Sequence, residues 1–366
     1  MNKAYKFRIY PTREQEELLT KTFGCCRFIY NIMLEDKIRE YKENGKMKKT
    51  TPAQYKKQFP WLKEVDSLAL ANVQLHLERA YKAFFSNPKS GFPRFKSKHH
   101  SRQSYTTNVV NGNISLTDGK LKLPKLKQMK ITVHREIPEG YVLKSVTVSR
   151  EPSGKYYASL LYEYSFCENQ RETVKNMEKV LGIDFAMDGM AVFSDGTRGG
   201  YPKYYRKTAE KLAREQRKLS HCEKGSRNYQ KQKRRVALCH EKVRNQRKDF
   251  HHKLSYRLSE EYDAVIVEDL DMKAMSRGLH LGKNVMDNGY GMFRGMLEYK
   301  LRERGKQMIR IDRFFPSSKK CSVCGKVREE LALSERIYRC SCGNEMDRDV
   351  NAAVNIREEG RKMLCA

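Results

Sequence analysis

The spacing of apolar and polar residues predicts a strand and two helices at the start of the chain. Residues 3–10 alternate between apolar and polar side chains, which is typical of a half-buried strand. Thr12 then predicts a helix start, because Gln15 lies three residues further on and completes a capping box. A second amphipathic helix is predicted with Ser67 as its N-cap.

In residues 105–165, apolar and polar side chains alternate with a period of two residues, which is typical of strands. Short alternating runs follow one another there, with turn residues between them. Together with strand 3–10 they predict a small β-barrel or sandwich that the helices interrupt. The polar stretch 167–178 predicts a linker between this part and the rest of the chain.

The second half alternates strands and helices. We expect buried strands, a hairpin strand, long basic helices and a closing helix. In chain order the predicted elements are strand 180–184, hairpin strand 190–196, helical segment 203–258, strand 264–269, helix 286–304, strand 307–312 and a helix from 349. This order predicts a layered α/β domain with a mixed sheet.

Composition indicates a globular protein with a large excess of positive charge. The 366 residues include 74 Lys and Arg against 44 Asp and Glu, a formal net charge of +30, and 39% are hydrophobic. These values exclude a wholly disordered basic tail and a collagen-like chain. There is no apolar run near the roughly 18 residues of a membrane span and no apolar signal segment at the start. We expect a soluble, cytoplasmic protein with a polyanionic partner and no membrane partner.

The positive charge is concentrated in two segments. Residues 203–258 contain 19 Lys and Arg and five acids, and residues 89–135 contain 11 Lys and Arg and one acid. Three aromatic residues, Phe92, Phe95 and Tyr105, lie between the charges of the second segment. Such rings could stack on exposed bases or pack in a core, and we favour the core.

Three acids stand at predicted element ends. Asp184 and Glu268 each end a buried strand, near the sheet edge where open α/β sheets bind ligands. Asp349 begins the closing helix. Carboxylates that converged there would repel one another unless cations neutralised them, and Mg²⁺ takes carboxylate oxygens. Two such ions can activate water and stabilise the leaving oxygen of a phosphodiester.

The residues alone leave alternatives for these acids. Each of them is also explained as a strand-end or N-cap residue, because Asp is favoured at helix N-termini. The spacing does not distinguish Glu268 from Asp269 or Asp271, nor Asp349 from Asp347.

Four of the ten cysteines lie within 22 residues and predict a metal site. Cys321 and Cys324 form one pair, and Cys340 and Cys342 form the second after fifteen residues. Four thiolates supply the closed tetrahedral shell of a structural zinc ion. The second pair has one intervening residue where two are usual, so its turn must differ. The other six cysteines are dispersed and are interpreted as core thiols rather than disulfides.

Several segments in a fixed order carry a family resemblance along almost the whole chain. They are KAYKFRIYPTREQEELLTKTFGCCRFIYN, SVTVSREPSGKYYASLLYE, LGIDFAMDGMAVFSDG, NQRKDFHHKLSYRL, AVIVEDLDM, RIDRFFPSSKKCSVCG and RCSCGNEMDRDVNAAVNI. With these segments the chain resembles the TnpB proteins of small bacterial insertion sequences, relatives of type V CRISPR effectors.

The resemblance implies an α+β and α/β multidomain fold. It implies a wedge-type β-barrel with an inserted helical recognition lobe, then an RNase H-like RuvC domain with an inserted zinc ribbon. The implied boundaries are 1–10 and 103–166 for the barrel, 11–102 for the helical lobe, 167–178 for the linker, 179–316 and 346–366 for the RuvC-like domain, and 317–345 for the ribbon.

The resemblance also implies a function. It implies a transposon-encoded, RNA-guided DNA endonuclease that binds a guide RNA from the transposon end and cuts double-stranded target DNA beside a short flanking motif. The family motifs give Asp184, Glu268 and Asp349 as the catalytic acids that bind two Mg²⁺ ions, with one structural Zn²⁺ on the four cysteines.

Two alternatives remain for this family. One is an RNA-guided repressor that does not cut, which the three intact acids disfavour. The other is a transposase acting directly in strand transfer. The two basic segments predict a two-walled channel for a guide–target duplex, and the sequence leaves the oligomeric state open.

Overall fold

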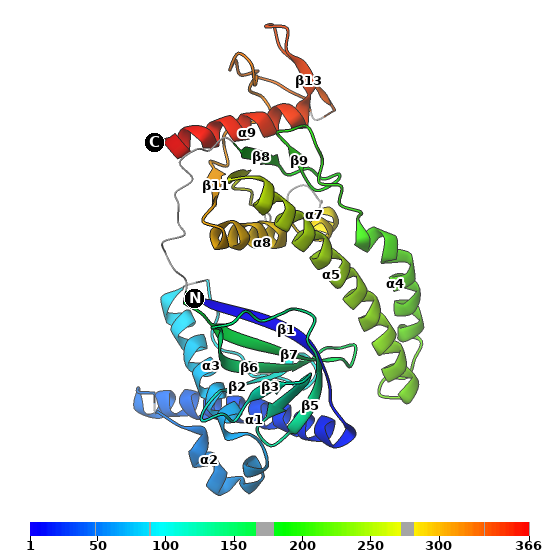
Figure 1. Ribbon diagram of the computed structural model, residues 1–366. Coiled ribbons are helices and arrows are strands. Elements are labelled where there is room, and N and C mark those ends of the chain that lie inside the picture. The colour runs from blue at the N-terminus through cyan, green and yellow to red at the C-terminus, as the bar shows by residue number, and fades with distance from the viewer. Residues whose placement is uncertain (48, 88, 166–178, 272–281, 333, 366) are drawn as a thin grey trace. The chain divides into compact units, whose positions relative to one another are not determined.

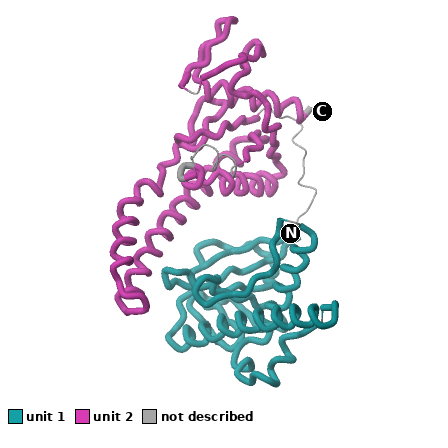
Figure 2. The backbone as a smooth tube through the Cα atoms, turned by 180° about the vertical axis from the view of Figure 1, so that it is seen from behind, with its two compact units in different colours: residues 1–166 teal, residues 167–366 magenta. Residues whose placement is uncertain are grey.

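The computed structural model describes residues 1–47, 49–87, 89–165, 179–271, 282–332 and 334–365. The fold consists of two compact units, residues 1–166 and 167–366 (Figure 2). The predicted linker 167–178 lies outside the described residues, and the finer domain boundaries stay predictions. Within the described part of the chain no helix is both long and apolar enough to cross a membrane.

The first unit is built on one antiparallel sheet of seven strands (Figure 1). Its strands are β1 (Asn2–Tyr10), β2 (Gln103–Asn108), β3 (Ser115–Thr117), β4 (Lys120–Leu123), β5 (Lys127–Thr132), β6 (Val142–Arg150) and β7 (Tyr156–Glu163). Their order is β2-β6-β7-β1-β5-β4-β3, so the N-terminal strand joins the later ones at the centre. The predicted strands are confirmed. A sandwich of two sheets is not formed, and no pairing among the described strands joins edges β2 and β3.

Four helices of the described residues lie between β1 and β2 in the chain. They are α1 (Arg13–Asn44), α2 (Pro52–Gln58), the 3₁₀ helix η1 (Pro60–Glu64) and α3 (Ser67–Ser86). Of these, α1 and α3 pack against the sheet, and α2 packs on α1 and α3. The capping box is present, since Thr12 caps the Gln15 N–H and the Gln15 side chain bonds back to Thr12. The N-cap of α3 is Asp66, whose carboxylate accepts the Leu68 N–H at 2.9 Å, and not Ser67 as predicted. A charged carboxylate is a stronger partner for this amide than a hydroxyl.

The second unit contains a mixed sheet of four strands in the order β11-β10-β8-β9. They are β8 (Val180–Asp184), β9 (Val192–Phe193), β10 (Ala264–Glu268) and β11 (Gln307–Ile311). β8, β10 and β11 are parallel, while β9 turns back antiparallel to β8. The predicted strands and the mixed sheet are therefore confirmed.

Helices and a small two-stranded sheet complete the second unit. They are α4 (Tyr204–Ser220), α5 (Arg227–Glu261), α7 (Gly282–Asn288), α8 (Tyr290–Glu303), β12 (Ile337–Arg339), β13 (Glu345–Asp347) and α9 (Arg348–Cys365). The helix predicted over 286–304 is in fact two helices. Gly289 separates them in the left-handed region at φ 64°, a conformation that glycine adopts without steric cost.

Two glycines allow α9 to lie directly on the sheet (Figure 1). A Cβ at Gly182 in β8 would collide with the backbone oxygen of Ala353 and lie 2.7 Å from the Arg357 nitrogen, both in α9. A Cβ at Gly360 in α9 would collide with the side chain of Ile266 in β10. The close approach fixes where the first turn of α9 lies relative to the ends of β8 and β10.

The aromatic residues of the basic segment 89–135 do not all behave as predicted. Tyr105 is buried in the first core. Phe92 and Phe95 are 45% and 57% exposed, so the core prediction is wrong for these two rings. Both rings lie on the loop between α3 and β2. Phe92 directly precedes the buried Pro93, and adjacent side chains of an extended chain point to opposite sides.

Candidate active site and metal centre

Asp184 and Glu268 lie side by side at the ends of parallel strands. The register pairs Ile183 of β8 with Val267 of β10, so the next residues of the two strands, the two acids, are neighbours. The preceding residues of both strands are fully buried, whereas the two acids are partly exposed. The hydrophobic runs thus fix the strands and leave the carboxylates at the sheet edge.

Asp349 lies in the first turn of α9, and Asp347 lies just before this helix. One oxygen of Asp347 accepts the N–H groups of Asp349 and Val350, at 3.0 and 3.1 Å, so Asp347 caps the helix. Its other oxygen accepts a bond from Arg198 at 2.8 Å. Arg198 also lies 4.0 Å from Asp349. Asp347 has both oxygens engaged, whereas Asp349 has one distant ion pair.

The electrostatics of Asp184 connect the three acids. Burial raises the pKa of Asp184 well above its ordinary range, and the Glu268 and Asp349 carboxylates raise it further. Burial also raises the pKa of Glu268, although the bond from Ser317 opposes this shift. Neighbouring carboxylates of this kind become stably ionised when a cation binds between them.

A set of side chains that the sequence did not reveal holds Glu268 in place. The Ser317 hydroxyl donates to Glu268 at 2.6 Å. The Asn355 side chain donates to the carbonyls of Ser317 and Lys320, and the Asn351 side chain donates to Lys320 and accepts the Ser322 N–H. Asn351 and Asn355 are four residues apart on one face of α9. This four-residue spacing is visible in the sequence, but the sequence does not indicate which groups the two side chains bind.

The acid next to Glu268 has other partners. Asp269 lies 3.0 Å from Arg313 and 3.7 Å from Arg294. The two neighbouring acids therefore have different partners in the structure. Asp269 belongs to an ion-pair cluster, while Glu268 points to Ser317 and adjoins Asp184.

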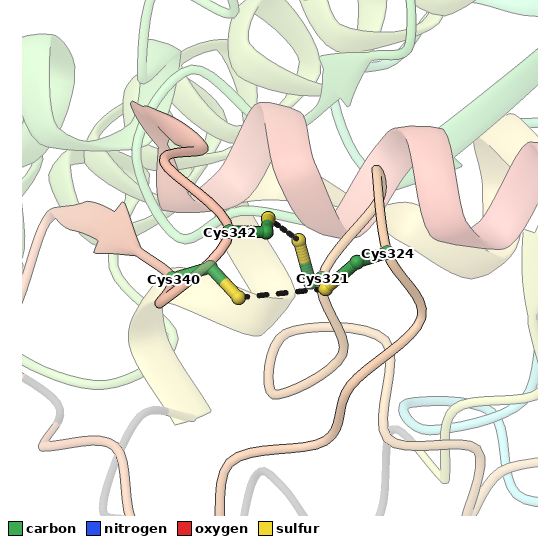
Figure 3. Close-up of side chains that lie close together, drawn as sticks. All are labelled: Cys321, Cys324, Cys340 and Cys342. Carbon is green, nitrogen blue, oxygen red and sulfur yellow. Dashed lines mark hydrogen bonds between the residues drawn. The ribbon is translucent and has the colours of Figure 1, made fainter.

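The four cysteines form a compact cluster (Figure 3). Cys321 and Cys342 are 3.6 Å apart between sulfurs, as are Cys324 and Cys340, and all four sulfurs lie within 4.8 Å of one another. Bonds of about 2.3 Å from zinc in a tetrahedron separate sulfurs by about 3.8 Å. The cluster therefore has dimensions that fit a tetrahedral ion.

Polar groups around Cys321 favour its thiolate form. Burial raises its pKa, but the Cys324 and Val323 N–H groups and the Asn344 side chain outweigh this effect and lower the pKa to about 6. Glycines follow both pairs, and Gly325 and Gly343 have φ values of 76° and 90°. These left-handed turns direct backbone N–H groups toward sulfur.

The two candidate ligand sets differ in how closely their ligand atoms lie together. Among the residues that the structure describes, the four cysteines are the group whose ligand atoms lie close enough to hold an ion together. The three carboxylates interact electrostatically but are not drawn together to that extent. Their oxygens are the ligands that Mg²⁺ prefers, so the donor set fits this ion chemically.

The basic segment 203–258 forms the helical hairpin of α4 and α5. One buried carboxylate ties this hairpin to the unit. Asp287, which is 3% exposed, accepts bonds from the Tyr201 hydroxyl at 3.0 Å, the Tyr205 and Arg206 N–H groups at 3.1 and 3.4 Å, and Arg247 at 3.4 Å. These bonds satisfy the free amides at the N-terminus of α4. The charged faces of the hairpin are thus held on a fixed scaffold.

Three family models match the chain. Residues 159–278 match a model described as "Probable transposase", residues 290–356 one described as "Cas12f1-like, TNB domain", and residues 1–46 one described as "Helix-turn-helix domain". In the structure residues 1–46 form β1 and the single helix α1 rather than two helices joined by a turn. Each of the three models covers less than half of the chain.

Curated relatives extend this similarity over the whole chain. A Streptomyces pristinaespiralis protein called "Putative RNA-guided DNA endonuclease" is 37% identical, over 98% of this chain and 90% of its own length. An Escherichia coli K12 protein called "Putative RNA-guided DNA endonuclease InsQ" is 31% identical over 99% of this chain and 93% of its own. The chain belongs to the TnpB family, as its sequence motifs predicted.

Solved structures of similar fold come from small CRISPR effectors. A Cas12f1 chain from a complex with guide RNA and target DNA has a TM-score of 0.54 at 14% identity, with 98% of both chains covered. A CRISPR-Cas_phi3 chain has a TM-score of 0.57 at 10% identity, covering 100% of this chain and 92% of its own. At such identities the likeness concerns the fold alone.

Proposed function

We propose that this protein is an RNA-guided DNA endonuclease encoded by a transposon. The observation that carries the proposal is the end-to-end similarity to two relatives with that printed name. The adjacency of Asp184 and Glu268 supports a hydrolytic site, because acids from distant segments end on neighbouring strands. A net charge of +30 suits a protein that holds nucleic acid, since phosphate neutralisation dominates such affinity.

In the proposed site Asp184, Glu268 and Asp349 hold two Mg²⁺ ions. When bound, such ions supply an activated water and stabilise the leaving oxygen of the phosphodiester. The protein's own residues orient the ligands. Ser317 fixes one oxygen of Glu268 and leaves the other free, and the seat of α9 on Gly182 holds Asp349 near the strand ends. Asp347 is proposed as the helix cap and not as a metal ligand.

The four cysteines are proposed to hold one structural zinc ion within a ribbon over 317–345. With zinc bound, all four positions would supply thiolates, so the shell would have no open place for water or substrate. In the same proposal residues 1–10 and 103–166 form a wedge-type barrel, and residues 179–316 and 346–366 form a RuvC-like nuclease domain. The guide RNA is proposed to derive from the transposon end.

A two-part experiment tests the function. The protein is purified from cells carrying its native locus, and the co-purifying RNA is sequenced. A plasmid matching that RNA is then incubated with the complex and Mg²⁺, alongside Asp184→Asn and, as a control, Asp249→Asn, whose carboxylate is exposed and paired with Lys253. We expect cutting by the wild type and the control. Metal ligation stabilises the transition state by several kcal/mol, so Asp184→Asn should cut at least about 100-fold more slowly.

The outcomes separate the remaining functions. Guide-dependent binding without cutting would indicate a repressor. Joined DNA products would indicate a transposase, the activity named in the description of the model that matches residues 159–278. Equal cutting by wild type and Asp184→Asn would refute the assignment of the acids.

A further inference from the structure

Exposed aromatic rings gather at the C-terminal end of α3. Phe85 and Phe92 are 67% and 45% exposed, and Phe84 is partly exposed. The rings touch one another, with centroids 5.2 Å apart for Phe84–Phe85 and 5.4 Å for Phe84–Phe92. Tyr81 is buried beneath them, 5.6 Å from Phe92. We call Phe84, Phe85 and Phe92 the α3 aromatic surface.

The loop that supplies Phe92 is held firmly. The side-chain amide of Asn31 in α1 bonds to both backbone groups of Lys96, donating to its oxygen at 2.9 Å and accepting its N–H at 2.8 Å. The Lys96 ammonium lies 3.9 Å from the ring centre of Tyr30. Pro93 is buried between these anchors and Phe92. The exposed ring therefore lies on an anchored loop, so the binding of a ligand costs little additional conformational entropy of the loop.

The surroundings of this surface are positively charged. Residues 79–102 contain seven Lys and Arg and no Asp or Glu. Within the described part of the chain, none of the ion pairs involves Lys82, Lys89, Arg94 or Lys98, and all four are exposed. Apolar rings surrounded by unneutralised cations suit a ligand with flat apolar faces and a negative backbone.

We propose that the α3 aromatic surface binds unpaired nucleotides of the RNA that the protein carries, with bases stacked on Phe85 and Phe92 and phosphates facing the surrounding cations. This inference rests on the proposed function. A duplex hides the faces of its bases, whereas loops and ends of a structured RNA expose them to aromatic side chains. Stacking accepts any base, so the surface would hold RNA without specifying sequence.

A binding assay tests the surface without any cleavage. The full-length protein, stripped of RNA, is titrated into fluorescein-labelled oligo(U) of 12 nucleotides and into a 12-base-pair RNA duplex. We expect Phe85→Leu/Phe92→Leu to bind oligo(U) at least about 10-fold more weakly, because two stacking rings are lost, and to bind the duplex as the wild type does. Tyr41→Leu, which removes an exposed ring elsewhere in the same unit, is the matched control.

The salt dependence distinguishes stacking from charge. Leucine removes no charge, so the slope of log K against log salt should stay unchanged in Phe85→Leu/Phe92→Leu. Lys89→Gln/Arg94→Gln should reduce the magnitude of that slope by about 1–2. Oligo(U) affinity within twofold of the wild type in the leucine variant would overturn the proposal. So would a lowered melting temperature with unchanged affinity, since the rings would then cover another part of the protein.

Crosslinking identifies the strand that occupies the surface. The complex is purified from cells fed 4-thiouridine and irradiated before any DNA is added, and we expect crosslinks in peptide 82–102. Crosslinks that form there only with thiothymidine DNA after target addition would assign the surface to DNA and overturn the proposal. If no RNA co-purifies, the proposed function fails, while the oligo(U) titration still decides whether the rings bind unpaired nucleotides.

Discussion

The four cysteines and the three acids of the second unit are two candidate ligand sets that are assembled in opposite ways. The cysteines come from 22 consecutive residues and lie within 4.8 Å of one another in the fold. The acids come from three segments that are 84 and 81 residues apart, and they adjoin only because β8 and β10 are parallel neighbours and α9 lies on them. The first set depends on local turns, and the second depends on the topology of the whole unit.

The two sets are nevertheless linked through α9. This helix carries Asp349 in its first turn, and its Asn351 and Asn355 side chains bind the backbone of residues 317–322. That segment contains Ser317, the partner of Glu268, and Cys321. The cysteine cluster and the acids are thus connected through one helix, so damage to one set is expected to reach the other.

Removal of the proposed zinc ion should have the largest effect. Binding of a structural zinc ion contributes about 10 kcal/mol or more to folding, so chelation or Cys321→Ser should unfold residues 321–342. The sheet should persist, because its buried cluster of strand and helix residues includes no cysteine of the site. Hydrogen exchange measured by mass spectrometry, with zinc content, checks both statements. Cys222→Ser, outside the cluster, is the control, and full protection of 321–342 without zinc would contradict the prediction.

Gly182→Ala should disturb the acids without touching a ligand. The added methyl would collide with the Ala353 backbone, which cannot rotate away as a side chain can, and α9 must shift. Overpacking of this kind costs about 3 kcal/mol. Urea unfolding measures the loss, and cleavage should fall because Asp349 moves with the helix.

Gly295→Ala provides the matched comparison for that substitution. Gly295 lies in α8, and a Cβ there would meet no atom within 4 Å. Alanine should therefore stabilise this helix by up to about 1 kcal/mol. An equal loss of stability in both variants would show that the close contact between Gly182 and α9 does not determine the position of Asp349.

The contrast between local and topological sets explains what could be predicted from the sequence. Cys321 and its partners were identifiable because cysteines that are two or three positions apart in a turn also lie close together in space. Asp184 and Glu268 were identifiable as strand ends, but their adjacency and the ion pairs that engage Asp269 appear only in the structure. Ser317 had no signal, because its partner lies 49 residues away.

The sequence also could not show which aromatic rings of the basic segment 89–135 are exposed. The rings of Phe92 and Tyr105 occur in the same basic segment, yet Tyr105 is buried and Phe92 is not. Tyr105 lies on β2, where alternation sends it to the core. Phe92 lies on a loop whose direction is set by the Asn31–Lys96 bonds, a contact between residues 65 positions apart. Local pattern predicts burial in strands and fails in anchored loops.

Asp184→Asn should separate the acids from the cysteines in their effect on stability. Without metal, burial and two neighbouring carboxylates disfavour the ionised Asp184, so a neutral amide removes repulsion. The free energy of unfolding of the variant should rise by about 1 kcal/mol, within the usual range for one substitution, and its melting temperature should rise with it. Mg²⁺ should raise the melting temperature of the wild type and not of the variant. A destabilised variant would mean that the acids are held by bonds rather than poised for cations.

The smallest effect is expected at Asp347, and it tests the choice of the third acid. Asn is as good an N-cap as Asp, so Asp347→Asn should keep the bonds to the Asp349 and Val350 N–H groups and lose only the charge opposite Arg198. That ion pair is about half exposed, and such pairs contribute about 0.2–1 kcal/mol. Cleavage by Asp347→Asn should stay within a few-fold of the wild type, whereas Asp349→Asn should lose at least about 100-fold, the loss expected for a metal ligand.

The contribution of the helix cap is measured by Asp347→Ala, which should lower the free energy of unfolding by about 1 kcal/mol more than Asp347→Asn. The reverse order of cleavage rates would make Asp347 the ligand and Asp349 the bystander, and the cap geometry would then have to change when metal binds.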